Sequence, residues 1–477
     1  YSFRCYPLKI NGIDVDATLK KVETVLSEEK GLSPAIKSVV ELLVLLITLL
    51  VSRLNLDSRN SSKPPSSDPN RKKVSGAKGD KKAGGQKGHV GVTLKKVDDP
   101  DEIKIIKLNR RNLPPGKYKK VGYESRQVFD IEISRVVTEY QAEILEDSNG
   151  NQFVAPFPEG VTKAVQYGGD LKAHSVYMSQ YQLIPYKRIQ EYFSDQLGIP
   201  VSEGSIYNFN QEAYGSLEPF EVNANEQLAG SALLHADETG ININGDRHWL
   251  HSASNDLWTN YFPHKSRGSE AMDSIGILPL FGGVLCHDHA KAYYKYSCIH
   301  SLCNAHHIRE LEGVWENDKH QWARDTKSLL EEMHRAVNEA GGMLEAGESE
   351  KYRQRYRLIL KNGEAECPPP DKANRKGKRG RVKRTKARNL MERLIEFEDD
   401  ALRFMDNKIV PFTNNLAEND IRMTKVQQKI SGCFRSMEGA KYFCRIRSYL
   451  STCRKQAINL SQALQLLFRG ELPDFVG

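Results

Sequence analysis

The chain has 477 residues, with 69 Lys and Arg against 61 Asp and Glu, a net charge of +8, and 39% hydrophobic residues. This length predicts two to four domains, and the hydrophobic content is sufficient for a globular core. The excess of positive charge lies mainly in 69–96, 371–388 and 421–455. Such clusters favour a polyphosphate partner, nucleic acid above all, although any one of them could be a solvated loop.

The eight cysteines include no Cys-x-x-Cys pair, which argues against a secreted disulfide framework and favours a reducing, cytoplasmic setting. The longest apolar stretch, Val39 to Val51, is interrupted by Glu41 and is too short to span a bilayer comfortably. We therefore expect no contact with membranes.

The first 160 residues predict three segments. Residues 1–60 form a helical arm whose apolar stripe could serve a coiled coil or could pack on its own domain; the stripe consists of Leu43, Leu46, Leu50 and Leu54. Residues 61–100 have the Ser, Pro, Gly and Lys composition of a basic, flexible linker. Residues 101–160 alternate apolar and polar side chains, as at 132–140, which predicts the strands of a small β module.

Residues 161–229 predict helices. An amphipathic helix over Pro185–Leu197, with Gly198 as its C-cap, precedes a second helix for which Ser202 is the N-cap. Two helices joined by a short turn are the outline of a helix-turn-helix, which binds DNA, and equally of an ordinary helical hairpin.

Residues 230–477 predict a mixed α/β domain. Short apolar runs, Ala232–Leu234 and Gly283–Cys286, read as buried strands. Two paired strands are expected over Arg247–Ser252 and Trp258–Pro263, after a turn at 244–246. A helical insertion is expected at about 304–405, and a final helical segment follows it.

Three acidic residues of this domain form a candidate metal site. Asp237 and Asp288 each follow one of the two apolar runs, and Glu418 opens a helix. Carboxylate oxygens are the ligands that hard divalent cations prefer, and two such ions can promote in-line phosphoryl displacement. Each residue also has a local alternative. Asp237 could belong to a turn, Asp288 could pair with a neighbouring histidine, and Glu418 could complete a capping box begun by Asn415.

Basic residues near this site are candidate DNA contacts. Helical spacing puts Glu418 on one face with Arg422, Lys425 and Lys429, and Arg435 follows in the same basic cluster. His307 and Arg309 could also reach a phosphate. Cys303 and His306 form a Cys-x-x-His step that could be half of a zinc site, although no second half is evident nearby.

Along nearly its whole length the chain resembles the transposases of bacterial insertion sequence 66 elements. The matching segments include Asn60–Asp68, Gly84–His89, His235–Gly240, Arg247–His251, Gly268–Asp273, His287–His289, His300–His306, Pro411–Glu418 and Lys429–Ser436. Many long matches in one order make the resemblance specific. Relatives often carry a cysteine zinc module where 105–145 lie; this segment has no cysteine, so a zinc role there is not expected.

The resemblance implies an RNase H-like catalytic domain of the DDE type, with Asp237, Asp288 and Glu418 as the triad. It implies a DNA transposase that uses Mg²⁺ or Mn²⁺, as two ions, to cleave element ends and join their 3′ hydroxyls to target DNA. It further implies a homo-oligomer and possible accessory proteins of the same element. Two alternatives stay open: a catalytically decayed copy that only binds DNA, and a structure-specific nuclease on the same fold. The first letter of the chain is Tyr1 rather than Met, and relatives differ at Ala290, Ala292 and Asn419.

Overall fold

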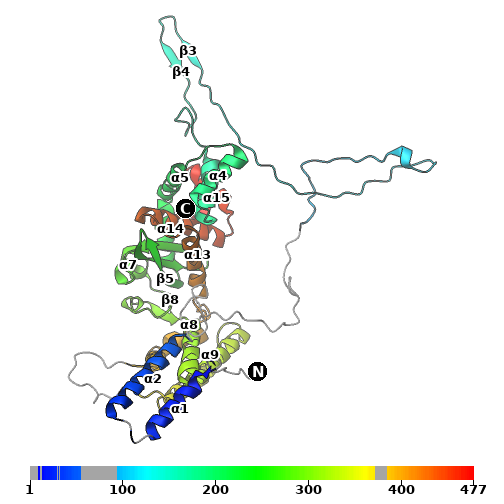
Figure 1. Cartoon of the computed structure of the whole chain (residues 1–477). Coiled ribbons are helices and arrows are strands. Elements are labelled where there is room, and N and C mark those ends of the chain that lie inside the picture. The colour runs from blue at the N-terminus through cyan, green and yellow to red at the C-terminus, as the bar shows by residue number, and fades with distance from the viewer. Residues whose placement is uncertain are drawn as a thin grey trace. The chain divides into compact units, whose positions relative to one another are not determined.

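The computed structural model describes residues 9–10, 13–28, 31, 33–54, 94–370 and 384–476 (Figure 1). Most of the predicted basic linker at 61–100, and most of the basic cluster at 371–388, lie outside these residues. Contacts divide the chain into two compact units, one made of 1–71, 158–191 and 200–477, the other of 72–157 and 192–199. In the part of the chain that the structure describes, no helix combines the length and apolarity needed to cross a membrane.

The predicted N-terminal arm is a pair of helices rather than one. A two-residue hairpin of β1 (Lys9–Ile10) and β2 (Ile13–Asp14) leads into α1 (Val15–Glu28), and α2 spans Pro34–Leu54. Proline is favoured in the first turn of a helix because the missing N–H has no partner there, which is why α2 begins anew at Pro34. Several leucines of α2 are about half exposed, including Leu43 and Leu50.

Residues 94–157 contain less β structure than the alternating sequence predicts. After a 3-10 turn at η2 (Arg110–Asn112), the described pairing is one antiparallel hairpin of β3 (Ile144–Glu146) and β4 (Gln152–Val154). The predicted strand at 132–140 is not paired, and Val136 is 87% exposed. Alternation indicates an extended chain, but a sheet also needs a partner strand and a cover for its apolar face, and the described residues provide neither here.

The helical region at 161–229 follows its prediction closely. The helices are α3 (Gly169–Val176), the π-helical turn η3 (Tyr177–Tyr181), α4 (Tyr186–Leu197), α5 (Glu203–Ser216) and α6 (Glu218–Ala229). Gly198 ends α4 in the left-handed conformation, with φ +61°, as a glycine C-cap does. The Ser202 hydroxyl accepts the Ser205 N–H at 3.0 Å and caps α5.

A mixed five-stranded sheet, in the order β7-β6-β5-β8-β9, is the centre of the larger unit. Its strands are β5 (Leu233–Ile243), β6 (Asp246–Ser254), β7 (Thr259–His264), β8 (Val284–His287) and β9 (Ile299–Leu302). Strand β6 pairs antiparallel with both β5 and β7, and strand β8 pairs parallel with both β5 and β9. The chain is thus a mixed α/β protein that is mostly helical.

Two local features allow the strands of this sheet to pair as they do. The β5–β6 turn is formed by Asn244 (φ +51°) and Gly245 (φ +92°), so the predicted turn is confirmed as a two-residue hairpin loop with both central residues at positive φ. At the start of β8, a Cβ on Gly283 would lie 2.6 Å from the Ala232 carbonyl oxygen. A glycine is therefore required there for β8 to lie beside β5.

Helices cover the sheet and form the insertion. Between β7 and β9 lie α7 (Ser269–Ile275), η4 (Leu278–Leu280) and η5 (Tyr293–Lys295). The predicted insertion contains α8 (Asn304–Asp318), α9 (Gln321–Glu339), α10 (Ala346–Gly363), α11 (Lys386–Glu396) and α12 (Glu398–Asp406). The chain ends with α13 (Asn415–Ser431), α14 (Met437–Lys455), α15 (Leu460–Phe468) and η7 (Asp474–Val476).

Among the described residues, these helices contribute to two of the apolar cores. One lies within the insertion and includes the fully buried Trp322 and Tyr356. The other joins β5 and β6 to α13 and α14 through Ile241, Leu250 and Ile421. Since α13 packs against β5 and β6, the second core fixes the helix that carries Glu418 against the strand that carries Asp237 (Figure 1).

Candidate functional site

The parallel pairing of β5 and β8 puts Asp237 and Asp288 at matching positions. The register aligns Leu233 with Val284 and ends with His235 opposite Cys286. Each aspartate lies two residues past this last pair, Asp237 within β5 and Asp288 directly after β8. Neighbouring strands lie about 4.8 Å apart, which brings the two carboxylates close together.

Asp237 differs from its prediction in one respect. It does not end a short strand, because β5 continues for six more residues and pairs Asp237 with Ser252 of β6. The alternative in which Asp237 belongs to a turn is therefore not realised. Asp288, in contrast, directly follows β8, and its Oδ1 accepts the Ala290 N–H at 3.1 Å.

The charges of the other two predicted acidic residues, Asp288 and Glu418, both act on Asp237. Burial raises the pKa of Asp237 well above its ordinary value, and the charges of Asp288, Glu238 and Glu418 raise it further. One hydrogen bond opposes this, from the Glu238 N–H to Asp237 Oδ1 at 2.8 Å. Among the described residues, neither Asp237 nor Asp288 has an ion pair with a cationic side chain. Such a cluster would be stabilised by a divalent cation.

Asn414 positions Glu418 beside this pair. Its Nδ2 donates to the Ala236 carbonyl at 2.8 Å, and its Oδ1 lies 2.8 Å from Nδ1 of His235. The side chain thus ties the start of α13 to β5, one residue before Asp237. The predicted capping box is not formed, since the N-cap is Asn414 rather than Asn415 and its side chain makes no cap hydrogen bond.

The carboxylate of Glu418 faces the start of α8. Its Oε1 lies 3.4 Å from Arg309 Nη2, 3.6 Å from His306 Nδ1 and 3.9 Å from Cys303 Sγ. Cys303 is buried and accepts the Asn414 N–H on its sulfur at 3.1 Å. Burial and the charge of Arg309 lower the pKa of His306. Both residues of the Cys-x-x-His motif therefore lie close to the carboxylate of Glu418, which is 115 positions from Cys303 in the sequence.

The predicted DNA contacts occupy three kinds of position. Arg422, Lys429 and Arg435 are exposed. Lys425 is partly buried, and its Nζ donates to the Gly240 carbonyl at 2.9 Å. His307 is 2% exposed, and its Nδ1 lies 3.0 Å from Oδ1 of Asn304, so this imidazole packs inside the protein.

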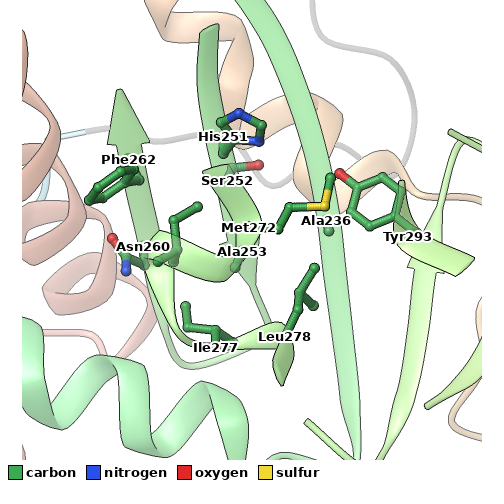
Figure 2. A pocket seen from close by; sticks show the side chains of 11 residues that line it. Ala236, His251, Ser252, Ala253, Asn260, Phe262, Met272, Ile277, Leu278 and Tyr293 are labelled. Atoms are coloured by element: carbon green, nitrogen blue, oxygen red, sulfur yellow. The ribbon is translucent and has the colours of Figure 1, made fainter. Parts of the chain in front are cut away.

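The opposite face of the sheet is occupied differently. Glu238, next to Asp237, has a side chain that is 1% exposed; Arg267 Nε donates to its Oε1 at 2.8 Å and Tyr293 Oη to its Oε2 at 2.7 Å. A cavity of about 20 Å³ lies on this face under Ala236 and Tyr293 (Figure 2). Its lining is mainly apolar and its volume suits about one water molecule, so it is not a nucleotide site.

Sequence reasoning missed several residues of the site. The contact of Asn414 with His235 spans 179 positions of the sequence. The contacts of Arg267 and Tyr293 with Glu238 span 29 and 55 positions, and no local sequence pattern reveals contacts of this kind. Arg393 of α11 is a further case. Its guanidinium pairs with Glu310, burial lowers its pKa, and the charge of Asp288 raises that pKa.

Comparison with known proteins identifies the family of the chain. A family model described as Transposase IS66 family matches residues 164–442, which include all three carboxylates, and a model described as a family of unknown function (DUF6444) matches 17–95. No curated protein matches the chain. The first match covers more than half of the 477 residues, and the chain therefore belongs to the IS66 family of transposases, enzymes that bind and process DNA.

Proposed function

We propose that the chain is a DDE-type DNA transposase whose catalytic carboxylates are Asp237, Asp288 and Glu418. The observation that carries the proposal is the parallel register of β5 and β8, which puts Asp237 and Asp288 at equivalent positions, together with the Asn414 side chain that ties the start of α13 to β5. Among the described residues neither aspartate has an ion pair with a cationic side chain, and burial followed by the charges of neighbouring carboxylates raises the pKa of Asp237. A buried carboxylate that is perturbed in this way is typical of a functional site.

We also propose that the sheet and its covering helices are an RNase H-like domain, with α8–α12 as its helical insertion. Two observations support this. The sheet is mixed, with two carboxylates at matching positions of adjacent central strands. The third carboxylate comes from a helix that packs on the same strand.

The residues fit Mg²⁺ or Mn²⁺. Both ions take carboxylate oxygens, and the like charges around Asp237 provide the negative field that a small divalent cation needs. When bound, two such ions supply Lewis-acid stabilisation of the attacking and leaving oxygens in phosphodiester cleavage and strand transfer. Asp237 and Asp288 would hold them from the rigid sheet, and Glu418 from α13.

The surrounding residues have separate roles in this proposal. Arg309 orients the Glu418 carboxylate through its contact at 3.4 Å. Arg422, Lys429 and Arg435 are exposed and suited to phosphates of the element end or the target. Because the two ends of an element must be joined together, we expect the active form to be a homo-oligomer, with accessory proteins of the same element as possible partners.

A cleavage assay tests the proposal. Purified protein with Mg²⁺ should nick a DNA fragment at a specific element end, and Glu418→Gln should abolish nicking while DNA affinity stays within about twofold. Glu438→Gln, an exposed glutamate at the start of α14, is the matched control and should cleave normally.

The other outcomes identify the alternatives. Tight binding to element ends without cleavage by the wild type would indicate a decayed copy. Cleavage directed by branched structure rather than by end sequence would indicate a nuclease. Equal cleavage by Glu418→Gln and the wild type would refute the assigned role of Glu418.

A further inference from the structure

We propose that Cys303, His306 and Glu418 form a second cation site, suited to Zn²⁺ rather than Mg²⁺. Among the described residues, this is the group of His, Cys, Asp and Glu side chains whose ligand atoms all lie within 4.8 Å of one another. Filling the site would draw Glu418 away from Asp237 and Asp288. Binding of the ion stands on the geometry alone, whereas its inhibitory effect rests on the function proposed above.

The distances are close to those of a tetrahedral zinc centre. Bonds of about 2.3 Å to sulfur and about 2.0 Å to nitrogen or oxygen give ligand edges of roughly 3.5 Å for S···O and roughly 3.3 Å for N···O. The structure has 3.9 Å between Cys303 Sγ and Glu418 Oε1, and 3.6 Å between His306 Nδ1 and the same oxygen. The two edges that meet at Glu418 are therefore within a few tenths of an ångström of the tetrahedral values, and the third edge, between Cys303 and His306, is no longer than 4.8 Å.

The donor atoms are prepared for a metal. His306 Nδ1 is buried without a hydrogen-bond partner in the described structure, and a buried polar atom of this kind calls for an explanation. The Asn414 N–H that donates to Cys303 Sγ would stabilise a thiolate. When the ion binds, the thiol proton leaves to solvent and sulfur supplies an electron pair to the metal.

Ligand chemistry decides which ion is bound. A thiolate and an imidazole select Zn²⁺ and similar borderline ions, whereas Mg²⁺ binds poorly to both. Three protein ligands leave the fourth position for water. Arg309, 3.4 Å from the same Glu418 oxygen, would have to withdraw, because a guanidinium and a metal ion cannot share that oxygen.

Cobalt substitution tests the binding without any DNA. Co²⁺ added to the full chain should give a thiolate-to-cobalt charge-transfer band and the visible bands of tetrahedral cobalt, and Zn²⁺ should remove both. Cys303→Ser should lose the charge-transfer band, and His306→Gln should weaken Co²⁺ binding at least tenfold. Cys433→Ser, at a half-exposed free cysteine, is the matched control and should keep the wild-type spectrum.

A second measurement tests inhibition. In the presence of Mg²⁺, micromolar Zn²⁺ should inhibit cleavage by the wild type. The Zn²⁺ concentration that inhibits cleavage should be at least tenfold higher for Cys303→Ser. Each cleavage rate is normalised to the rate of the same protein without Zn²⁺. A folded wild type without a charge-transfer band, or a Cys303→Ser variant that keeps it, would overturn the site. An inactive wild type would count against the transposase alone, since the spectra decide the metal site independently.

Discussion

Two adjacent carboxylates on β5 show how differently the two faces of the sheet are built. Burial raises the pKa of both Asp237 and Glu238. On the Glu238 face, the charge of Asp288 also raises the pKa, but Tyr293 and Arg267 donate to the carboxylate and partly reverse the effect. On the Asp237 face, the neighbouring side chains are Asp288 and Glu418, whose charges add to it. The first face satisfies its buried charge, whereas the second accumulates charge.

This difference separates a structural carboxylate from a functional one. Both residues are carboxylates and they are neighbours in the sequence, so neither property distinguishes them. The distinction lies in the partners. For Glu238 they come from η5 and from the loop before α7, and for Asp237 from the residue after β8 and from α13. Removing a partner of Glu238 should therefore lower the free energy of unfolding, whereas removing the charge of Asp237 should raise it.

The largest expected effect is on catalysis at the Asp237 face. Asp237→Asn should lower Mg²⁺-dependent cleavage by roughly three orders of magnitude, because it removes several kcal/mol of charge stabilisation at the metal site. The cleavage rate at saturating DNA measures this. Tyr293→Phe is the comparison variant from the Glu238 face, and its cleavage rate should stay well above that of Asp237→Asn. Equally low cleavage rates for the two variants would contradict the proposed distinction between the faces.

The next effect concerns stability at the Glu238 face. Tyr293→Phe removes the donor at 2.7 Å from a carboxylate that is 1% exposed, and should lower the free energy of unfolding by about 2 kcal/mol. Denaturant melts with and without the substitution measure it. Tyr140→Phe, at a half-exposed tyrosine, should change it by less than about 0.5 kcal/mol, and equal losses in both variants would contradict the structural role of Tyr293.

A stability change of opposite sign is expected at the Asp237 face. The raised pKa of Asp237 means that the folded state favours the protonated carboxyl. The stability that this preference contributes is complete below the unfolded pKa of 3.8, and it is lost as pH rises through the folded pKa. In EDTA, Asp237→Asn should therefore be more stable than the wild type by about 1–3 kcal/mol near pH 7. The gap should close towards pH 4 and shrink when Mg²⁺ is added. A variant less stable than the wild type at pH 7 would contradict this account.

The smallest effect is expected for single surface cations of α13. Lys429→Ala should reduce the dependence of log affinity on log salt by about 1 and weaken binding similarly for all sequences, because one phosphate contact is lost. Lys351→Ala, at an exposed position of α10, should leave the slope unchanged. Identical slopes for wild type and Lys429→Ala would remove Lys429 from the DNA interface.

The sequence predicted those features that depend on neighbouring residues. The Asn244-Gly245 turn, the Gly198 C-cap and the Ser202 N-cap are confirmed, because φ preferences and short side-chain hydrogen bonds are decided locally. The helical character of 304–405 was also foreseen. Where an expected strand needed a distant partner, as at 132–140, the alternation of side chains was not enough.

The acidic residues of the candidate site could be proposed from the sequence and stay a prediction, whereas the residues that support them could not be proposed. Asp237, Asp288 and Glu418 were expected from their contexts, and the parallel register of β5 and β8 now gives a physical reason for two of them. The bridge made by Asn414 and the donors to Glu238 depend on tertiary packing, and the turn expected at Asp237 gave way to an 11-residue strand paired on both edges.

The most direct test of the central claim is a Mn²⁺ titration followed by the electron paramagnetic resonance of the free ion. If Asp237, Asp288 and Glu418 hold the same ions, then Asp237→Asn, Asp288→Asn and Glu418→Gln should each weaken Mn²⁺ binding at least tenfold, whereas Glu438→Gln should bind as the wild type does. Wild-type Mn²⁺ affinity in any one of the three variants would show that this residue does not share the site, and would contradict the account.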